Sequence, residues 1–282
     1  MVPAAVMIPS TVDEAVHMLA SVADARVLAG GTDFMIEVNY GHVKPRSVVS
    51  LRALSSLRSW ERDGSRLRLG AGLRFSDILS SELATLAPAL AQAARTVGSP
   101  QIRNAGTIGG NVATASPAGD CLPVLYALNA VIELAGPDGR RSMPISKFIT
   151  GVKRTALQAG EIIVSITIPV ASGPQEFVKV GKRNAMVIAL ANLALIVDAN
   201  EHTVACALGS VGPTIIRCSA AETLVSSQMN WQRMRLDDPS LYGHFGTLCA
   251  QSARPITDHR ATAEYRRHAI AVLARRVLAR AA

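Results

Sequence analysis

The sequence predicts a mixed α+β protein that folds as two consecutive domains. The first 55 or so residues carry a short unit in which strands and helices alternate, and further strands with a hairpin turn follow as far as residue 169. Glycine and proline then cluster in ASGPQ (171–175), a composition that suits a linker. We therefore expect one domain over 1–172, divided into subdomains of about 1–55 and 56–172, and a second domain over 173–282.

The amino-terminal unit is expected to hold two helices and two strands. The segment 10–20 opens with Ser and Thr followed by two acidic residues, which is typical of a capped helix start. A short apolar strand at 26–29 runs into paired glycines, after which Asp33 is expected to cap a second helix that ends at Gly41. The β-branched segment 47–51 predicts the second strand.

Strands and helices continue through the rest of the first domain. We expect a strand over 66–72 and helices over 74–81 and 82–97. The segment 124–135 should begin as a helix and continue as a strand. The segment GPDGR (136–140) predicts a hairpin turn. The segment EIIVSITIP (161–169) alternates as a strand does, so one of its faces should carry Ile162, Val164, Ile166 and Ile168.

The second domain should begin with strands and end with helices. The expected strands lie in 177–183, in the apolar run that ends at Val197, and in 203–212. The last helix, 263–282, is amphipathic, and its apolar stripe consists of Ile270, Leu273, Val277 and Leu278.

Composition and charge exclude several classes of protein. Hydrophobic residues make up 49% and charged residues 18%, which predicts a folded rather than a disordered chain. The net charge is +8, but the basic residues are scattered and not interleaved with aromatics, so nucleic-acid binding is not expected. The apolar run 184–197 is too short to span a membrane, and the first residues lack the basic start of a secretory signal. We expect a cytoplasmic protein.

No catalytic or metal-binding set is visible in the sequence. The four cysteines, at 121, 206, 218 and 249, are far apart and show neither zinc nor iron–sulfur spacing, which predicts reduced thiols and no metal. The six histidines are dispersed, and neither a nucleophile elbow nor a P-loop lysine occurs. A chain that only relays electrons through a bound cofactor needs no such residues, because the cofactor performs the chemistry.

The first glycine-rich segment, LAGGTDFM (28–35), places two glycines between a strand and a helix. Glycines permit positive φ and leave backbone amides accessible, so such a turn suits an anion such as a diphosphate. The alternative is an ordinary tight turn. The spacing is not G-x-G-x-x-G, so a Rossmann dinucleotide site is not indicated.

The second glycine-rich segment, GTIGGNVATASPAGDCLP (106–123), is rich in small uncharged polar residues without regular periodicity. That composition predicts a loop wrapped along an extended polar ligand, with Asp120 accepting a hydrogen bond from a ribose or ribityl hydroxyl. A long surface loop is the alternative.

Together, AGGTDFM (29–35) and TIGGNVATASPAGDCLPVLYAL (107–128) resemble the two FAD-binding motifs of the molybdenum hydroxylase flavoprotein family. The TIGGN run followed nine residues after its Asn by an Asp is the specific element. Members of this family resemble the medium subunits of bacterial carbon monoxide dehydrogenase and the flavin domain of xanthine dehydrogenase. The resemblance extends over nearly the whole chain, including 10–20, 161–169, 177–190 and 258–270.

The resemblance implies a set of cofactor-binding residues and no catalytic or metal-ligating residue. Backbone amides that cradle the FAD diphosphate would come from Ala29, Gly30, Gly31, Thr32 and Asp33. Further flavin and diphosphate contacts would come from Thr107, Ile108, Gly109, Gly110 and Asn111. Single positions would be Asp120 at a sugar hydroxyl, Ile163 near the adenine, Lys179 beside the flavin ring and Ile188 over its face. Val97 replaces an aromatic residue of xanthine dehydrogenase, so stacking there is not implied.

The resemblance also implies a fold and a role. The fold is a two-subdomain α/β FAD-binding domain of the PCMH/VAO type, followed by a C-terminal domain with a small antiparallel sheet and helices. The role is that of an oxidoreductase subunit with non-covalent FAD. Electrons from a molybdopterin centre on a large subunit would cross [2Fe–2S] clusters on a small subunit, reach FAD here, and leave to an external acceptor. The implied assembly is a dimer of heterotrimers.

Two other functions fit parts of the sequence. A self-sufficient flavin oxidase or reductase would need its own acid–base residues, and a covalently attached flavin would need His or Cys where Thr32 and Asp33 stand. A non-catalytic scaffold that has lost its flavin is the second alternative. The intact glycines of both motifs argue against it.

Overall fold

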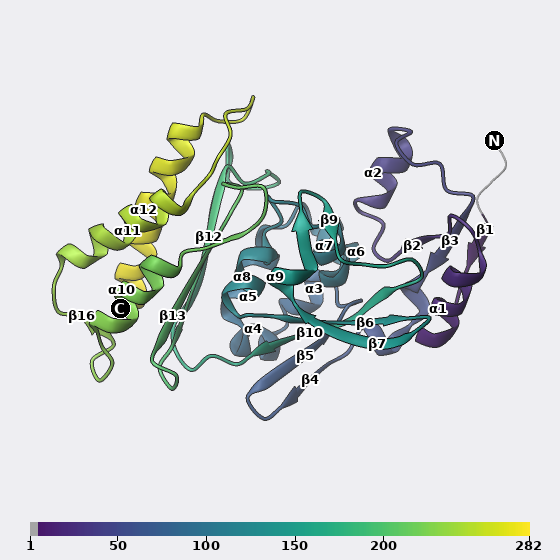
Figure 1. Ribbon diagram of the computed structural model, residues 1–282, viewed down its shortest axis with the longest axis horizontal. Coiled ribbons are helices and arrows are strands. Elements are labelled where there is room, and N and C mark those ends of the chain that lie inside the picture. The colour runs from purple at the N-terminus through teal and green to yellow at the C-terminus, as the bar shows by residue number, and fades with distance from the viewer. Residues whose placement is uncertain (1–4) are drawn as a thin grey trace.

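The computed structural model describes residues 5–282 and divides into three parts along its length (Figure 1). The amino-terminal part is a three-stranded parallel sheet of order β1-β3-β2 with two helices. Its elements are β1 (Ala5–Met7), α1 (Val12–Ser21), β2 (Arg26–Leu28), α2 (Phe34–Asn39) and β3 (Ser47–Ser50). Both predicted strands and both predicted helices are confirmed. The prediction missed β1, which is only three residues long.

Helix α1 begins where the capping pattern placed it. The Thr11 hydroxyl accepts a hydrogen bond from the Glu14 amide at 3.1 Å, and the Glu14 carboxylate accepts one from the Ser10 amide at 2.7 Å. The predicted cap of α2 is wrong in its mechanism. Asp33 occupies the N-cap position but makes no side-chain bond to the helix, because its carboxylate accepts from Thr114 Oγ1 at 3.1 Å instead.

The middle part is a five-stranded antiparallel sheet of order β4-β5-β10-β6-β7, covered on one face by short helices. Its strands are β4 (Trp60–Asp63), β5 (Arg66–Gly70), β6 (Val131–Gly136), β7 (Gly139–Pro144) and β10 (Ile162–Pro169). Its helices are η1 (Leu51–Ala53), η2 (Ser55–Leu57), α3 (Phe75–Ile78), α4 (Ser81–Leu86), α5 (Pro88–Thr96), α6 (Pro100–Ala105), α7 (Ile108–Thr114), α8 (Cys121–Ala127) and α9 (Ile145–Phe148). The small pair β8 (Ile149–Gly151) and β9 (Arg154–Thr155) completes it.

Strand β10 is central to this sheet, and its predicted single apolar face is wrong. The register with β6 shifts between Ile163 and Ser165, so the alternation of side chains reverses there. Ile162 and Val164 pack with α1 in one core cluster, whereas Ile166 and Ile168 pack under α5 and α8 in another. The bulge therefore joins the amino-terminal part to the middle part through a single strand.

Two predicted helical regions are more broken than expected. The segment 82–97 forms α4 and α5, because Ala87 leaves helical geometry (φ −135°, ψ 65°) ahead of Pro88, which starts the second helix. The segment 106–123, predicted to be a loop, is mostly helical. Thr107 caps α7 by accepting from the Gly110 amide at 3.0 Å, and the left-handed Ala115 (φ 47°) ends that helix before α8.

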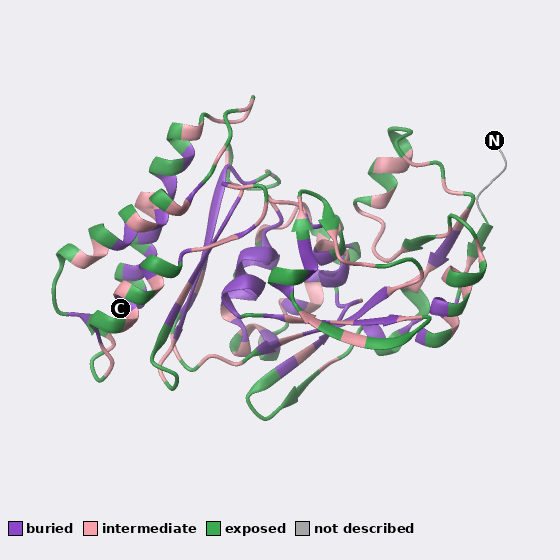
Figure 2. Cartoon of the chain, in the orientation of Figure 1, coloured by how far each residue is buried: buried purple, intermediate pink, exposed green. Residues whose placement is uncertain are grey.

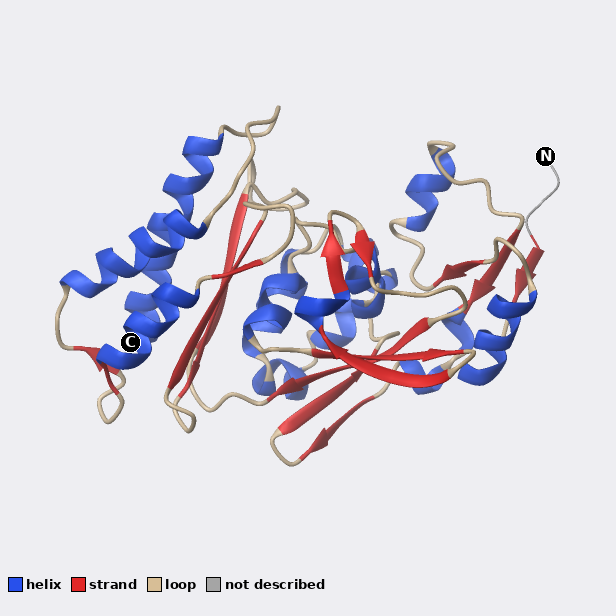
Figure 3. Cartoon of the chain, in the orientation of Figure 1, coloured by secondary structure: helices blue, strands red, loops and turns tan. Residues whose placement is uncertain are grey.

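The C-terminal part is a four-stranded antiparallel sheet of order β11-β12-β13-β14 under three helices. Its strands are β11 (Gln175–Val180), β12 (Ala191–Asp198), β13 (Thr203–Gly209) and β14 (Ile216–Arg217), with the small pair β15 (Met229–Asn230) and β16 (Arg235–Leu236). The helices α10 (Ser219–Gln228), α11 (Ser240–Ser252) and α12 (Ala263–Ala281) cover its outer face (Figure 3). Of the predicted stripe on the last helix, Ile270, Val277 and Leu278 are fully buried.

Burial of β12 on both faces explains the second half of the apolar run 184–197, and β13 beside it is buried in the same way (Figure 2). Residues 184–188 of the run lie before β12 in a connecting segment that is mostly exposed. The three C-terminal helices cover one face, and α5 and α8 of the middle part lie against the other. Strands covered on both faces read as continuous apolar segments rather than alternating ones. Across residues 5–282, no helix combines the length and apolarity needed to traverse a bilayer.

We expect the C-terminal core to depend on Phe245, which is fully buried on α11. Phe245→Ala should lower the free energy of unfolding by about 3–5 kcal/mol, because it removes a large buried side chain and leaves a cavity. Tyr265→Ala, an aromatic truncation at a side chain that is 46% exposed on α12, should change it by roughly 0.5 kcal/mol or less. Denaturant unfolding of the two variants measures both. Equal losses would contradict this assignment of the core.

Candidate functional site

A pocket of about 500 Å³ lies between the amino-terminal and middle parts, and we call it the glycine pocket. On the amino-terminal side, its walls are the end of β2, the turn after β2 and the segment after β3. On the side of the middle part, they are the turn after β5, the α6–α7 junction and the start of β10. Its size falls within the range of small-molecule and cofactor sites.

The parallel pairing of β2 and β3 brings two of these walls together. Leu28 is aligned with Ser50, so both strands end at the same edge of the sheet. The chain leaves β2 through Gly30 and Gly31 and leaves β3 toward Arg52, and all three residues line the pocket. The carboxyl edge of parallel strands is the usual place for a ligand in such sheets.

Two glycines allow the remaining walls to close. A Cβ on Gly30 would lie 2.1 Å from the carbonyl oxygen of Ala105, and a Cβ on Gly109 would lie 2.6 Å from Ala71. Both distances are impossible for a side chain, so these positions require glycine for close backbone approach. Gly31 requires glycine for another reason, because its φ is +75°. The glycines of both sequence motifs therefore build one pocket.

The two glycine segments differ in what their amides offer to a ligand. Within residues 5–282, the amides of Gly30, Gly31, Thr32 and Asp33 donate no hydrogen bond. By contrast, the Ile108 amide donates to Leu73 O and the Gly109 amide to Ala71 O, both at 2.9 Å. The first segment thus presents free donors, whereas the second contributes mainly a wall without side chains.

The glycine pocket is electropositive. Arg52, Arg58 and Arg74 line it, and Arg74 is held in an ion pair with Asp77 at 2.9 Å. Glu161 is the acidic residue among the described lining. The Glu161 carboxylate accepts hydrogen bonds from Arg141 at 2.6 and 2.7 Å, which lower the pKa of Glu161 and keep it paired. Free amides together with surplus guanidinium groups favour an anionic ligand.

The structure brings half of the sequence-predicted site residues to this pocket. Its lining includes Ala29, Gly30, Gly31, Thr107, Gly109, Gly110 and Ile163. Thr32 and Asp33 follow directly at the start of α2. The Ile108 side chain points into the hydrophobic core, and the Asn111 side-chain oxygen is buried without a partner. Val97 packs at the edge of the same core.

Asp120 and Lys179 lie outside the pocket lining and form a buried ion pair across the two domains. Lys179 Nζ lies 2.5 Å from Asp120 Oδ2, and their side chains are only 9% and 6% exposed. Thr96 and Asn192 donate to the same carboxylate at 2.9 and 3.2 Å. Burial raises the pKa of Asp120, and these three donors oppose that rise. Ile188 lies beyond β11 in a connecting segment and is 52% exposed.

Sequence reasoning missed the three arginines of the pocket. Arg52 follows the second strand of a parallel pair, so its place beside Gly30 was available from the predicted β/α unit. Arg58 and Arg74 had no such signal, because they reach the pocket through η2 and through the turn after β5.

Two known protein families match the chain in consecutive segments that together cover nearly its whole length. Residues 3–171 match the FAD binding domain in molybdopterin dehydrogenase, and residues 176–281 match the CO dehydrogenase flavoprotein C-terminal domain. The chain is 31% identical to the xanthine dehydrogenase FAD-binding subunit of Escherichia coli O157:H7, with 96% of this chain and 94% of that protein covered. It is 33% identical to the carbon monoxide dehydrogenase medium chain of Hydrogenophaga pseudoflava, with 74% and 75% covered.

Solved structures share the fold over the full length. A chain of reconstituted CO dehydrogenase from Oligotropha carboxidovorans superposes with a TM-score of 0.89 at 26% identity, covering 100% of this chain and 99% of that one. A chain of quinoline 2-oxidoreductase from Pseudomonas putida 86 gives a TM-score of 0.90 at 24% identity, covering 99% and 96%. The predicted fold class is therefore confirmed.

The buried pair yields a prediction about stability. Lys179→Met should lower the free energy of unfolding at pH 7 by about 3–5 kcal/mol, because it strands a buried carboxylate. The pKa of Asp120 then rises further above its unfolded value, so the folded state binds a proton more tightly than the unfolded state does. Stability of the variant should therefore fall as the pH is raised from about 4 to 7, relative to the unchanged chain.

The double variant Lys179→Met/Asp120→Asn is the matched control, because it removes the stranded charge. The double variant should regain most of the lost free energy of unfolding. Its stability should no longer fall with pH in the way predicted for Lys179→Met. Urea unfolding between pH 4 and 8 measures both quantities. If Lys179→Met has the same dependence of stability on pH as the unchanged chain, then Lys179 does not control the protonation of Asp120.

Proposed function

Because the chain belongs to the family of FAD-binding subunits of molybdopterin dehydrogenases, we propose that the glycine pocket holds one non-covalent FAD and that the chain is the electron-transfer subunit of such a complex. When bound, FAD accepts electrons from one redox partner and gives them to another. The chain itself is thus an oxidoreductase component whose residues bind and orient the cofactor.

One observation carries the proposal for the pocket: four consecutive amides without a hydrogen bond, those of Gly30 to Asp33, begin in the pocket wall at Gly30 and Gly31, and arginines line the same pocket. The amides of Gly30 to Asp33 suit the oxygens of a diphosphate. Arg52 and Arg58 supply matching charge, whereas the guanidinium of Arg74 is paired with Asp77. The close backbone contacts at Gly30 and Gly109 hold the two glycine segments against their neighbours in the pocket wall. The residues present therefore fit FAD.

Other residues are proposed to contact the cofactor away from the diphosphate. Ile163 lines the pocket with an apolar side chain, which suits the adenine ring. Asp120 is proposed to bind a sugar hydroxyl and Lys179 to lie beside the flavin ring, and both stand in the buried network between the two domains. Ile188 is proposed to cover the face of the flavin ring. Its side chain is 52% exposed, so it is free to contact the cofactor.

The domain division and the partners are proposals of the same kind. We place the boundary at residues 172 and 173, between β10 and β11. Relatives are named as a FAD-binding subunit and a medium chain, which supports a place in a multi-subunit complex. We propose a large molybdopterin subunit and a small [2Fe–2S] subunit as the partners, a dimer of heterotrimers as the assembly, and an external electron acceptor. The four cysteines are free thiols, which supports a reducing, cytoplasmic location.

The alternatives receive less support. A covalently attached flavin needs a nucleophilic tether, and none of the described residues that line the glycine pocket is His or Cys. A scaffold without flavin would have no need to keep free amides and three arginines around a pocket walled by glycine.

The flavin site predicts a specific loss of affinity. The full chain should be yellow or take up about one FAD, and acid should release the flavin intact. Arg58→Gln should weaken FAD binding about tenfold or more, because it removes a charged group from the pocket. Arg62→Gln removes the same charge on β4, where Arg62 bonds only to Gly64 O, and should leave the affinity unchanged. Fluorescence titration gives both constants. A colourless chain that takes up no FAD would contradict the proposal.

The subunit role predicts dependence on partners. The isolated, FAD-loaded chain should not reduce a dye with xanthine, carbon monoxide or an N-heterocyclic substrate, because no described residue of the pocket forms an acid–base or nucleophilic set. It should accept electrons from dithionite and pass them to the same dye. Substrate-dependent dye reduction by this chain alone would favour the self-sufficient enzyme instead.

A further inference from the structure

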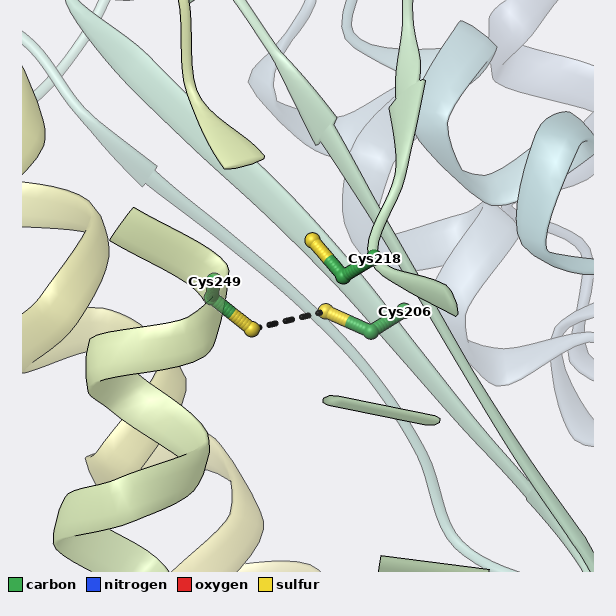
Figure 4. Close-up of side chains that lie close together, drawn as sticks. All are labelled: Cys206, Cys218 and Cys249. Atoms are coloured by element: carbon green, nitrogen blue, oxygen red, sulfur yellow. Dashed lines mark hydrogen bonds between the residues drawn. The ribbon is translucent and has the colours of Figure 1, made fainter. Parts of the chain in front are cut away.

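Three of the four cysteines meet inside the C-terminal core, although they are far apart in the sequence (Figure 4). Cys206 lies on β13, Cys218 stands at the N-cap of α10 and Cys249 lies on α11. Their sulfur atoms all lie within 4.8 Å of one another, and Cys206 Sγ is 3.8 Å from Cys249 Sγ. All three residues are fully buried, at 0% exposure.

The separation of the sulfur atoms suits a shared metal ion. A thiolate lies about 2.3 Å from a bound d¹⁰ ion, so sulfurs around one ion are about 3.8–4.0 Å apart. The Cys206–Cys249 distance of 3.8 Å falls in that range, and the third sulfur is close enough to reach it by a small side-chain adjustment. A disulfide would instead need about 2.05 Å.

The donor set favours an ion that accepts three sulfurs and no water. Among the described residues, no His, Asp or Glu joins the group. The cysteines belong to an apolar core cluster, with Ser252 and Glu222 as polar neighbours. The nearby Glu222 is already engaged, because its carboxylate accepts from the Cys206 amide at 2.8 Å and from Arg217 at 2.7 Å. Structural Zn²⁺ sites are almost always four-coordinate, whereas soft thiolates select Cu(I) as well as Zn²⁺. A dry three-sulfur set therefore favours Cu(I).

The position of Cys218 suits a negatively charged sulfur. Cys218 stands at the N-terminus of the ten-residue helix α10, whose dipole stabilises an anion. Metal binding would release the thiol protons of the three cysteines.

We propose that Cys206, Cys218 and Cys249 form a buried three-sulfur site for one Cu(I) ion, which ties together β13, α10 and α11. The ion enters as the C-terminal domain folds, because the sulfurs have no access to solvent afterwards. The site is structural, and it is independent of the flavin proposal because it lies in a different core.

The test is the metal content of the full chain, produced in cells supplied with copper or with zinc and purified under reducing conditions. After exposure to a competing chelator, mass spectrometry of the digested protein gives metal per chain. Cys206→Ser and Cys249→Ser each remove one sulfur with little change of volume. Cys121→Ala is the matched control, because Cys121 is equally buried but belongs to the core of the first domain.

The unchanged chain and Cys121→Ala should each retain about one copper ion, and both serine variants should retain less than a tenth of that. Copper should also raise the thermal midpoint of the unchanged chain and leave that of Cys249→Ser unmoved, with circular dichroism showing that the variant is folded. Copper-free protein from copper-supplied cells, or equal copper in Cys249→Ser, would overturn the proposal. Zinc retained in preference to copper would overturn the choice of Cu(I).

Discussion

The close backbone contact between Gly30 and the Ala105–Gly106 peptide is the constraint on which the rest of the first domain depends. It brings the carboxyl edge of a small parallel sheet against the α6–α7 junction of a separate antiparallel sheet. A side chain at Gly30 would clash with the Ala105 carbonyl, so the two segments could not pack this closely. The amides after Gly30 donate no hydrogen bond among the described residues, and Gly31 lines the pocket together with Arg52 and Arg58. Subdomain packing and ligand recognition therefore rest on the same few atoms.

The ion pair of Asp120 and Lys179 plays a comparable part between the two domains. The carboxylate comes from the turn before α8, and the ammonium group comes from β11 in the next domain. A buried pair is weak evidence for stability, because desolvation offsets much of the Coulombic attraction. The pair mainly fixes positions, because Thr96 and Asn192 also donate hydrogen bonds to the Asp120 carboxylate from two further elements. The pair thus sets how the C-terminal sheet lies against the flavin-binding half.

Much of the fold was predictable, because local patterns and tertiary packing agree over most of the chain. The capping residues of α1, the turn between β6 and β7 and the parallel β2–β3 unit all follow from short-range chemistry. The bulge in β10 was not predictable, since a perfect alternation of Ile, Val and Ile hides which residue is skipped. The helix α7 was missed because a segment of small polar residues is as typical of a loop as of a tightly packed helix. The cysteine cluster was missed because spacing in sequence says nothing about residues joined only by sheet and helix packing.

The strand order of the five-stranded sheet also bears on how the chain reaches its fold. Strand β10 is the last of the five in sequence, yet it lies between β5 and β6. The hairpins β4–β5 and β6–β7 are complete in the chain before β10 is synthesised, so the edges of β5 and β6 that β10 covers stay unpaired until residues 162–169 leave the ribosome. Long-range pairing of this kind slows folding, and unpaired edges are where strands of other molecules attach. The nascent chain is therefore most exposed to aggregation just before its central strand arrives.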